Sequence, residues 1–205
     1  MRVGVVLLVA LLFLGACAAQ QQETGQKIQR YDVSVDDDPS MGSADAKITI
    51  IAFEDYECPF CGKFNAETLP ALKEKYIDTG MARFVVRDLP LVSKHPDALE
   101  AALAAGCAEE QGKYWDYHDI LFKNQDALKR DDLIHYAKIL LLDEEKFTSC
   151  LDNKRRLGEI QKDMADAKAL GVSGTPTFFV DGYKLEGAHP ITSFDTVISQ
   201  LQEEP

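Results

Sequence analysis

Residues 47–61, KITIIAFEDYECPFC, form the stretch that decides the fold. The β-branched, apolar run over residues 47–53 predicts a strand that is buried on both faces. After Cys58, apolar residues recur at about every fourth position, which predicts a helix with a kink at Pro70. The two cysteines of this stretch, Cys58 and Cys61, are therefore expected where a central strand ends and a helix begins.

The rest of the chain adds strands on both sides of a long helical region. Residues 81–89 predict a second strand, which completes a β-α-β unit. Apolar spacing of three and four residues predicts helices from about 94 to 170, with an end at Gly171. Residues 177–186 predict a hairpin with a tight Asp-Gly turn, and residues 190–202 predict a final helix. The fold class is α/β, with one helical insertion in the sheet.

Composition and charge exclude several classes of protein. The chain has 205 residues, of which 46% are hydrophobic and 27% are charged, so neither wholesale disorder nor a polytopic membrane protein is expected. The formal net charge is -12, and no cluster of Lys and Arg is present. Nucleic acid is therefore not an expected partner.

The N-terminus predicts export. An arginine at position 2 precedes an apolar run over residues 3–14, which is too short to span a bilayer comfortably. Leu14-Gly15-Ala16-Cys17 resembles the bacterial lipobox, so residues 1–16 are predicted to be a lipoprotein signal peptide and Cys17 the lipidated residue. Residues 17–30 would then be a flexible tether. A plain signal peptide cut near Ala19 and an uncleaved anchor are the alternatives, and all three place the body outside the cytoplasm.

Four cysteines remain after Cys17 is assigned to lipid. Cys58 and Cys61 form a Cys-X-X-Cys motif, whereas Cys107 and Cys150 stand alone. A zinc site would need two further ligands at suitable spacing, and the four histidines are scattered singly and are interpreted as surface or satisfied core residues. Redox chemistry at Cys58 and Cys61 is thus favoured, and no metal is expected.

Three motifs in order carry a family resemblance: residues 55–61 (DYECPFC), 111–115 (QGKYW) and 171–180 (GVSGTPTFFV). Together they resemble the DsbA-like branch of the thioredoxin superfamily, in a lipoprotein form. The resemblance implies a thioredoxin-like fold with an inserted all-helical domain. It divides the chain into a first thioredoxin-like part (31–91), the helical insertion (92–172) and a second part (173–205), and it implies no cofactor.

The same resemblance implies roles for the motif residues. Cys58 corresponds to the exposed nucleophile, Cys61 to the resolving cysteine and Pro176 to a cis-proline facing them. Thr175 corresponds to the residue whose backbone pairs with a bound substrate strand. Phe60 is expected to contact substrate and, with its neighbour Pro59, to tune the reduction potential.

Proton handling for Cys61 departs from the family pattern. Many relatives carry a buried acidic residue six positions before the first cysteine, where this chain has Ala52. Glu54 is a possible substitute, although a charged residue near a strand end is more often solvated. The helix start, with the N–H groups of Phe60 and Cys61, predicts a lowered pKa for Cys58.

Cys107 and Cys150 have two open interpretations. On the apolar faces of separate helices they fit inert buried thiols. Export and a similar second disulfide in some relatives favour a structural disulfide, which would contribute about 4 kcal/mol by chain entropy. We expect the disulfide.

The expected function is oxidation of exported proteins that carry free cysteines. A membrane redox partner of DsbB or vitamin K epoxide reductase type would then reoxidise the dithiol. A reductase or isomerase on the same scaffold and a non-enzymatic, chaperone-like lipoprotein are the alternatives. No N-terminal dimerisation domain precedes the first central strand, so a monomer tethered on the periplasmic face or the cell surface is expected.

Overall fold

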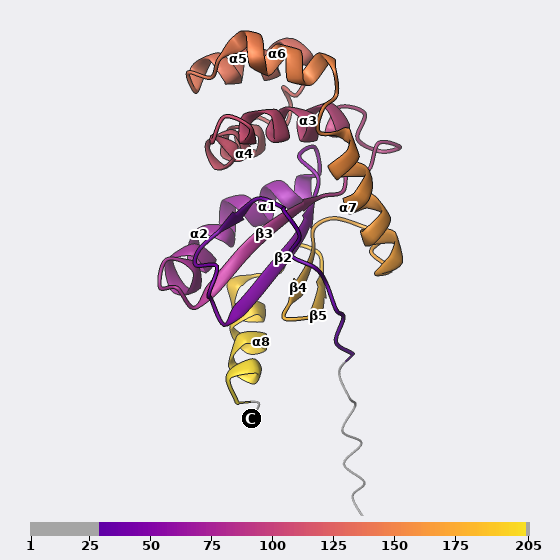
Figure 1. Ribbon diagram of the computed structural model, residues 1–205. Helices are drawn as coiled ribbons and strands as arrows, with labels where there is room; N and C mark the ends of the chain where they lie inside the picture. The colour runs from indigo at the N-terminus through magenta and orange to yellow at the C-terminus, as the bar shows by residue number, and fades with distance from the viewer. Residues whose placement is uncertain (1–28, 204–205) are drawn as a thin grey trace, which may run out of the picture.

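The computed structural model describes residues 29–203, which form a five-stranded sheet and its covering helices (Figure 1). β2 lies at the centre, parallel to β3 and antiparallel to β4, and β1 and β5 are the antiparallel edge strands. The strands are β1 (Ser40–Met41), β2 (Ile48–Glu54), β3 (Ala82–Asp88), β4 (Thr177–Val180) and β5 (Tyr183–Glu186). The predicted central strand, its parallel partner and the hairpin are confirmed, and the short β1 was not predicted.

The helix after β2 is divided into three segments: α1 (Pro59–Glu67), α2 (Leu69–Leu72) and the π-helix η1 (Lys73–Ile77). The break falls at Thr68, two residues before Pro70. Pro70 has no N–H to donate to the preceding turn, so the helical hydrogen bonds are interrupted there. The Thr68 hydroxyl donates instead to the carbonyl oxygen of His189, at 3.0 Å. The predicted interruption at Pro70 is therefore confirmed, although the N–H of Thr68 still donates to Phe64 at 2.9 Å and its carbonyl still accepts from Leu72 at 3.0 Å.

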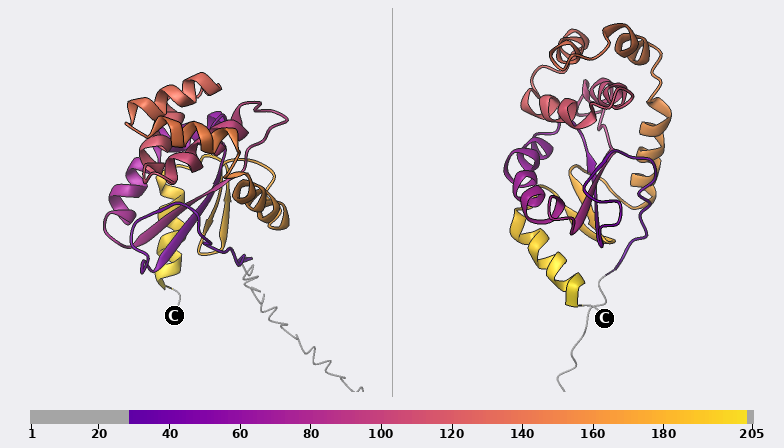
Figure 2. Two further views of the ribbon diagram at one scale, coloured as in Figure 1. Left: turned by 45° about the horizontal axis from the view of Figure 1, so that its top comes forward. Right: turned by 60° about the vertical axis from the view of Figure 1, so that its left-hand side comes forward.

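The helical region lies between β3 and β4 in the chain. Its helices are α3 (Ala98–Glu109), α4 (Tyr114–Lys123), α5 (Arg130–Ile139), α6 (Glu144–Asp152) and α7 (Leu157–Ala169). α3 to α6 stack beyond the carboxyl ends of β2 and β3, and α7 returns along the sheet (Figures 1 and 2). Gly171 follows α7 with a φ of 65°. The thioredoxin-like fold with inserted helices is confirmed, while the divisions at 91/92 and 172/173 remain predictions.

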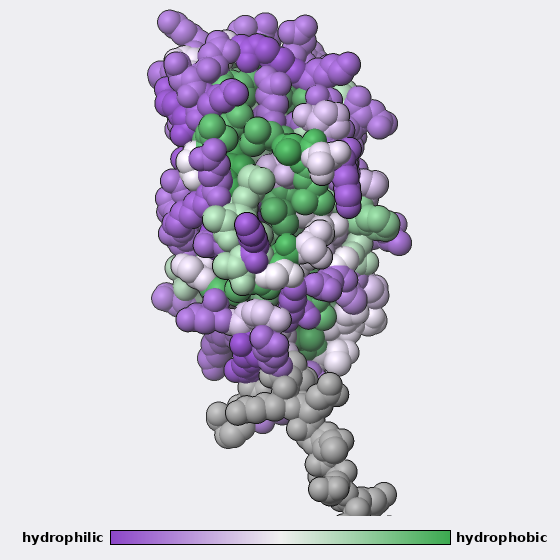
Figure 3. All heavy atoms as spheres, turned by 90° about the vertical axis from the view of Figure 1, so that its right-hand side faces the viewer, coloured by the Kyte–Doolittle hydropathy of each residue, from purple (hydrophilic) through white to green (hydrophobic). Residues whose placement is uncertain are grey.

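Two hydrophobic clusters lie on the two faces of the sheet. The larger joins α1, α2, the C-terminal helix α8 (Ile191–Glu203) and the inserted helices. The smaller lies under α7 and the segment before β1, and consists of Ile51, Phe53, Val85, Leu89, Ala167, Val172 and Phe179. The face on the α7 side carries hydrophobic surface across its middle, between hydrophilic margins (Figure 3). β2 is thus covered on both sides, as its continuous apolar sequence predicts.

Arg87 on β3 ties three elements together. Its side chain is 1% exposed and forms ion pairs with Asp38 at 3.0 Å, Asp163 at 2.7 Å and Asp166 at 2.7 Å. Burial, followed by the nearby Asp163, raises the pKa of Asp38 to about 7. A buried cation needs such partners, because an unpaired charge in the interior is costly. The contacts hold the segment before β1 and helix α7 against β3.

The hairpin between β4 and β5 is closed by Asp181 and Gly182, which have φ values of 44° and 84°. Two left-handed residues fit the turn that matches the twist of paired strands. Asp181 is also bonded to Thr49, whose backbone N–H donates to the Asp181 carboxylate at 2.8 Å. A side chain at Gly182 would meet the carbonyl oxygen of Tyr31 at 2.4 Å, so the position requires glycine. The predicted Asp-Gly turn is confirmed.

The predicted signal peptide, the lipidated Cys17 and nearly all of the tether lie outside the described residues. Among residues 29–203, no helix combines the length and the apolar character needed to cross a bilayer.

Candidate active site

Cys58 occupies the N-cap of α1, at the end of the loop that leaves β2. Its backbone is extended, with φ -72° and ψ 120°, and Pro59 fills the first helical position. Proline is suited to that position because its fixed φ is helical and its missing N–H would be unpaired anyway. The N–H of Gly62 donates to the Cys58 carbonyl at 3.1 Å and closes the first turn. The Cys58 sulfur therefore faces the free N–H groups of the helix start.

The sulfur of Cys58 lies against the loop before β4. Its thiol donates to the carbonyl oxygen of Thr175 at 3.3 Å, and the Thr175–Pro176 peptide bond is cis. The pKa of Cys58 is lowered to about 5. The largest cause is the hydrogen bond from the Cys61 thiol; the Thr175 side chain and the N–H groups of Cys61 and Phe60 add to it, against a burial effect that raises the pKa. These donors stabilise the thiolate, the reactive form in disulfide exchange.

The lowered pKa has the predicted direction, and two of its causes were missed. The N–H groups of the helix start were anticipated, whereas the Cys61 thiol and the Thr175 side chain were not. The nucleophile was expected to be exposed, and this expectation is wrong, since Cys58 is 4% exposed. The residue is enclosed because the Thr175 carbonyl lies against its sulfur.

The acidic residues before Cys58 are engaged by backbone donors and by a histidine. The Asp55 carboxylate accepts hydrogen bonds from the N–H groups of Glu57 and Leu91, each at 2.8 Å, and lies 2.8 Å from His95 Nδ1. Glu57 accepts from the N–H of Asp97 at 2.8 Å. These contacts fasten the loop after β3 to the active-site loop. The carboxylates of Asp55 and Glu57 are therefore bonded to groups other than the Cys58 sulfur.

Cys61 differs sharply from Cys58. It is fully buried, and its pKa is raised by burial first, then by the hydrogen bond to Cys58 and the charge of Glu54. One cysteine is therefore held ready as a thiolate and the other is held as a thiol. This division suits a nucleophile and a resolving cysteine.

Glu54 ends β2 and is 2% exposed, so its interpretation as a solvated residue is wrong. One carboxylate oxygen accepts from Asn65 Nδ2 at 3.0 Å, and the same nitrogen donates to the Cys61 carbonyl at 3.0 Å. The other oxygen lies 3.2 Å from Nε2 of His118, a fully buried residue of α4. Glu54 is thus placed beside Cys61. The association of His118 with this site was missed, because no local pattern links it to residues 64 positions earlier.

Gln125, in the loop after α4, contacts the active-site loop directly. Its side-chain amide donates to the carbonyl oxygens of Tyr56 and Cys58, each at 2.8 Å. A side chain at Gly62 would meet the Gln125 oxygen at 2.1 Å, so glycine at position 62 leaves room for this contact. Nothing in the sequence marked Gln125, since its role depends on tertiary placement alone.

Two large apolar side chains are unusually exposed on segments that adjoin Cys58. Phe60, within the motif, is 62% exposed, and Val92, on the loop fastened to Asp55, is 50% exposed. Exposed apolar side chains beside a reactive group are typical of a binding surface. The predicted substrate contact of Phe60 stays a prediction.

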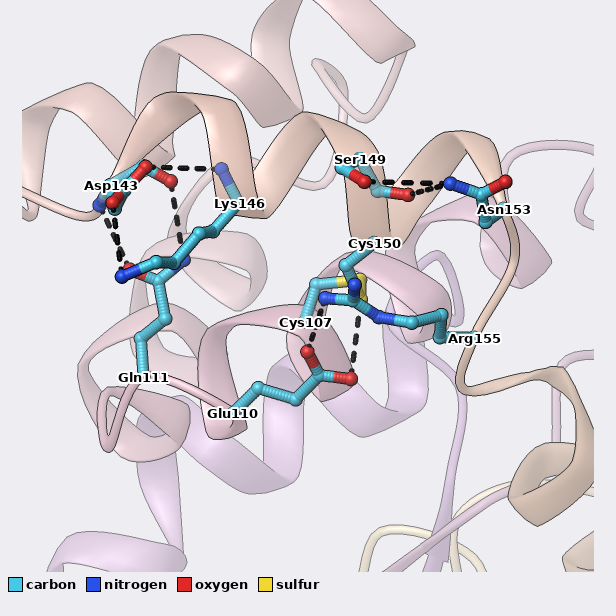
Figure 4. Close-up of polar contacts among 9 residues, drawn as sticks. All are labelled: Cys107, Glu110, Gln111, Asp143, Lys146, Ser149, Cys150, Asn153 and Arg155. Carbon is cyan, nitrogen blue, oxygen red and sulfur yellow. Dashed lines mark hydrogen bonds and ion pairs between the residues drawn. A yellow bond between two sulfur atoms is a disulfide. The ribbon is translucent and has the colours of Figure 1, made fainter.

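Cys107 of α3 and Cys150 of α6 are joined by a disulfide, with their Cα atoms 5.8 Å apart (Figure 4). Arg155 forms an ion pair with Glu110 at 2.5 Å beside the bond. Gln111 and Asp143 exchange two hydrogen bonds: the N–H of Asp143 donates to the Gln111 side chain at 2.8 Å, and Gln111 Nε2 donates to the Asp143 carbonyl at 3.3 Å. The bond therefore joins two helices that polar contacts already hold together.

Over residues 29–203, the structure contains no group of three or more His, Cys, Asp or Glu side chains arranged to hold a metal ion.

Comparison with known proteins identifies the family. The family model described as Thioredoxin matches residues 34–200. The DsbA-like protein α-DsbA1 of Wolbachia pipientis is 27% identical, with a TM-score of 0.72 over 82% of this chain and 92% of that chain. A thioredoxin-like oxidoreductase from Silicibacter pomeroyi is 26% identical, with a TM-score of 0.72 over 82% and 94%. BdbD from Bacillus subtilis has the same fold, with a TM-score of 0.77 at 24% identity over 85% and 98%.

Curated relatives of this chain carry a different name. A protein of Salinispora tropica named Na(+)/H(+) antiporter NhaA 3 is 41% identical over 166 residues, which are 81% of this chain. A second antiporter, from Herminiimonas arsenicoxydans, is 36% identical over 157 residues, or 77% of this chain. This chain spans about a quarter of the length of these relatives. The similarity therefore concerns one segment of each of them.

Proposed function

Since the chain belongs to the thioredoxin family, in its DsbA-like branch, we propose that it introduces disulfides into exported proteins by exchange at Cys58 and Cys61. One observation carries the proposal: Cys58 is surrounded by donors that lower its pKa to about 5. A cysteine with a low pKa is a good leaving group, so a mixed disulfide between Cys58 and a substrate is readily resolved by a second substrate thiolate, and the reduced enzyme is stabilised.

The reaction has two exchange steps. A substrate thiolate attacks the Cys58 sulfur of the Cys58–Cys61 disulfide, forms a mixed disulfide and expels Cys61, which takes up a proton. A second substrate thiolate then attacks the substrate sulfur of the mixed disulfide and expels Cys58 as a thiolate. The substrate loses two electrons and gains a disulfide, and the two cysteines are reduced.

The stability of the reduced form supports the oxidising direction. At pH 7 a pKa of about 5 stabilises the Cys58 thiolate relative to an ordinary cysteine. The two pKa units that separate Cys58 from the thioredoxin cysteine, whose pKa is about 7, correspond to about 3 kcal/mol, which makes the disulfide about 60 mV more oxidising than that of thioredoxin. Thioredoxin, with a cysteine pKa of about 7, has a potential of about -270 mV, so we expect about -200 mV here.

The substrate is proposed to bind along the Thr175–Pro176 loop. Thr175 lies at hydrogen-bond distance from the Cys58 sulfur, so a chain that is bonded to Cys58 passes close to its backbone. The exposed ring of Phe60 would contact apolar side chains next to the substrate cysteine. Such apolar contacts are weak and have low sequence specificity, which suits an enzyme that accepts many substrate proteins.

The site of action is proposed to be outside the cytoplasm, at a membrane. The lipobox-like segment that ends at Cys17 supports a lipid anchor, on a periplasmic face or at the cell surface. The segment shared with proteins named antiporters also supports a position beside a membrane, and antiport itself is not proposed. A monomer anchored there would meet a membrane redox partner of DsbB or vitamin K epoxide reductase type at high effective concentration.

The reduction potential of the Cys58–Cys61 pair tests the direction. The full-length protein in detergent would be equilibrated with glutathione buffers, alkylated and analysed by peptide mass spectrometry. A value near -200 mV or higher supports an oxidase. A value near -270 mV would instead make the protein a reductase or isomerase, the second candidate on this scaffold. If the pair does not exchange with glutathione at all, the chain is a non-enzymatic, chaperone-like lipoprotein.

A further inference from the structure

We propose that Glu54, His118 and Asp119 form a proton path from the Cys61 thiol to a pocket behind α1, on the side of the helix away from the substrate loop. This inference rests on the proposed exchange function and assigns positioning roles to two residues of the helical insertion. Glu54 receives the proton, and His118 and Asp119 carry it to solvent.

The chemistry requires such a path when the reduced pair is reoxidised. The Cys58 thiolate first attacks a disulfide of the oxidant and forms a mixed disulfide, releasing one thiolate. Cys61 then attacks the Cys58 sulfur, forms the Cys58–Cys61 disulfide and expels the second thiolate of the oxidant. Cys61 must lose a proton in this step, and the released thiolates take up protons from solvent. Because Cys61 is fully buried and the oxidant covers Cys58, the proton has no direct contact with water.

Glu54 is the acceptor that the geometry offers. Asn65 holds it next to Cys61, because one side-chain nitrogen donates to both the Glu54 carboxylate and the Cys61 carbonyl, each at 3.0 Å. Glu54 Oε2 then lies 3.2 Å from His118 Nε2. On the opposite side of the imidazole, His118 Nδ1 is buried without a hydrogen-bond partner, and the nearest carboxylate oxygen, of Asp119, lies 3.5 Å from it. A proton can therefore enter His118 at Nε2 as one leaves at Nδ1.

The path ends at a cavity. A hollow of about 670 Å³ lies between α1, α2 and α4, and its lining includes Asn65 and Asp119. The Asp119 side chain is 61% exposed, whereas His118 and Glu54 are buried. No residue of the Thr175–Pro176 loop lines the hollow, so a partner bound at that loop would leave it open to water. Apolar residues of α2 and α4 form much of the remaining wall.

The charged and titratable groups around the path favour proton transfer. Burial lowers the pKa of His118, but the nearby carboxylates of Asp119 and Glu54 outweigh it and raise that pKa. The adjacent His118 lowers the pKa of Asp119, and Lys123 lowers it further. The other titratable groups that face Glu54 are Cys61, Tyr56 and Tyr114, and burial raises the pKa of all three, so they stay protonated near neutral pH.

The test separates the two steps of reoxidation. The reduced, full-length protein in detergent is mixed with oxidised glutathione, quenched with acid at intervals and analysed as the peptide that contains Cys58 and Cys61. The mixed disulfide with glutathione reports the first step, and the internal disulfide reports the second. In His118→Gln, we expect the second step to be about tenfold slower between pH 6 and 7, with the first step within about twofold of wild type. The loss should shrink as the pH rises, because the Cys61 thiol then ionises without help.

Two further variants keep the test decisive. Asp119→Asn alters a largely exposed carboxylate, so the fold is preserved even if His118→Gln is unstable. It should slow the second step about threefold with the same pH dependence. His135→Gln is the matched control, because His135 is an exposed histidine of the same helical region, and it should leave both steps unchanged.

The outcomes are distinct. Unchanged second-step rates in folded His118→Gln and Asp119→Asn, at every pH, would overturn the path. A uniform loss in both steps without pH dependence would also overturn it, since that result indicates only a structural role. If the wild-type protein forms no mixed disulfide, the proposed exchange function fails before the path is tested.

Discussion

The two cysteine pairs of this protein share one chemistry and differ in use. Burial does not separate them, because Cys58 is 4% exposed, Cys61 and Cys150 are fully buried, and Cys107 is 1% exposed. What differs is the set of neighbours. The pKa of Cys58 is lowered first by the Cys61 thiol, and then by Thr175 and by two backbone N–H groups at a helix start. The comparison teaches that donors around a sulfur, more than its access to water, decide which pair is reactive.

The second pair lies between two helices that are already joined. α3 and α6 are bridged by Gln111 and Asp143 and, next to the disulfide, by Glu110 and Arg155 of the turn after α6 (Figure 4). The Cys107 and Cys150 sulfurs cap no helix start, since both residues lie in the last turn of their helices. This pair is therefore expected to cross-link and not to exchange.

The largest expected effect is on exchange itself. Cys58→Ser should reduce the rate of disulfide transfer to a reduced model protein by about 1,000-fold or more, because a hydroxyl cannot replace the thiolate. The double variant Cys107→Ala/Cys150→Ala should retain a rate within about twofold of wild type. Stopped-flow fluorescence of the substrate measures both. A large loss of transfer rate in the double variant would contradict the assignment of exchange to Cys58 and Cys61 alone.

For folding stability, the Cys107–Cys150 pair should matter more than the Cys58–Cys61 pair. The Cys107–Cys150 bond closes a loop with a sequence separation of 43 residues. Its removal should lower the free energy of unfolding by about 4 kcal/mol, because the unfolded chain regains the entropy of an open loop. Urea unfolding of Cys107→Ala/Cys150→Ala against wild type, both reduced at Cys58 and Cys61, measures the difference. A change below about 1 kcal/mol would show that the polar contacts between α3 and α6 suffice.

The pH dependence of the reduced protein should reveal the Cys58 thiolate. Its folded pKa, about 5, lies below the ordinary value of 9.0, so the thiolate contributes fully above pH 9 and its contribution is lost as the pH falls through 5. At pH 7 the contribution is about 3 kcal/mol relative to Cys58→Ser, and at pH 4 it is close to zero. Ultraviolet titration of the thiolate and urea unfolding at the two pH values measure it. A titration midpoint near 9 would remove the distinction between the two pairs.

Gln125 and Gln111 offer the finest comparison, because each is a glutamine that bonds backbone groups near one cysteine pair. Gln125→Leu leaves the carbonyls of Tyr56 and Cys58 without this donor and should cost about 1 to 3 kcal/mol of unfolding free energy, with a measurable rise in the Cys58 pKa. Gln111→Leu should cost about 1 kcal/mol or less, because its contacts are exposed, and should leave that pKa unchanged. Equal thiolate titrations for the two variants would contradict a role for Gln125.

Much of the fold was predictable because its signals are local. The apolar run before Glu54, the Asp181–Gly182 turn and the helical spacing between β3 and β4 each depend on neighbouring residues. The break at Thr68 was half anticipated from Pro70. The π-helix that follows it was not, since the pattern of apolar residues in a π-helix differs little from that of an ordinary helix over one turn.

The site was only partly predictable, for a different reason. Cys58, Cys61 and the Thr175–Pro176 loop lie within recognisable motifs. His118 and Gln125 lie outside any motif and reach the site because the inserted helices pack over the end of β2. The same packing buries Glu54, which a reading of the strand end alone placed in solvent. Contacts between remote segments cannot be read from spacing along one segment.

The close fit of Gln125 over Gly62 has a consequence for protein engineering. The Cys58 carbonyl of the Cys-Pro-Phe-Cys segment is held by a residue 64 positions beyond Cys61, and Gly62, directly after the segment, has no room for a methyl group. A scaffold that received this segment without a glutamine at that place would lack the hydrogen bond to the Cys58 carbonyl, so the same four residues would be held less firmly. Conversely, exchange of the helical insertion between relatives would change the reactivity of the Cys-Pro-Phe-Cys segment without altering any of its residues.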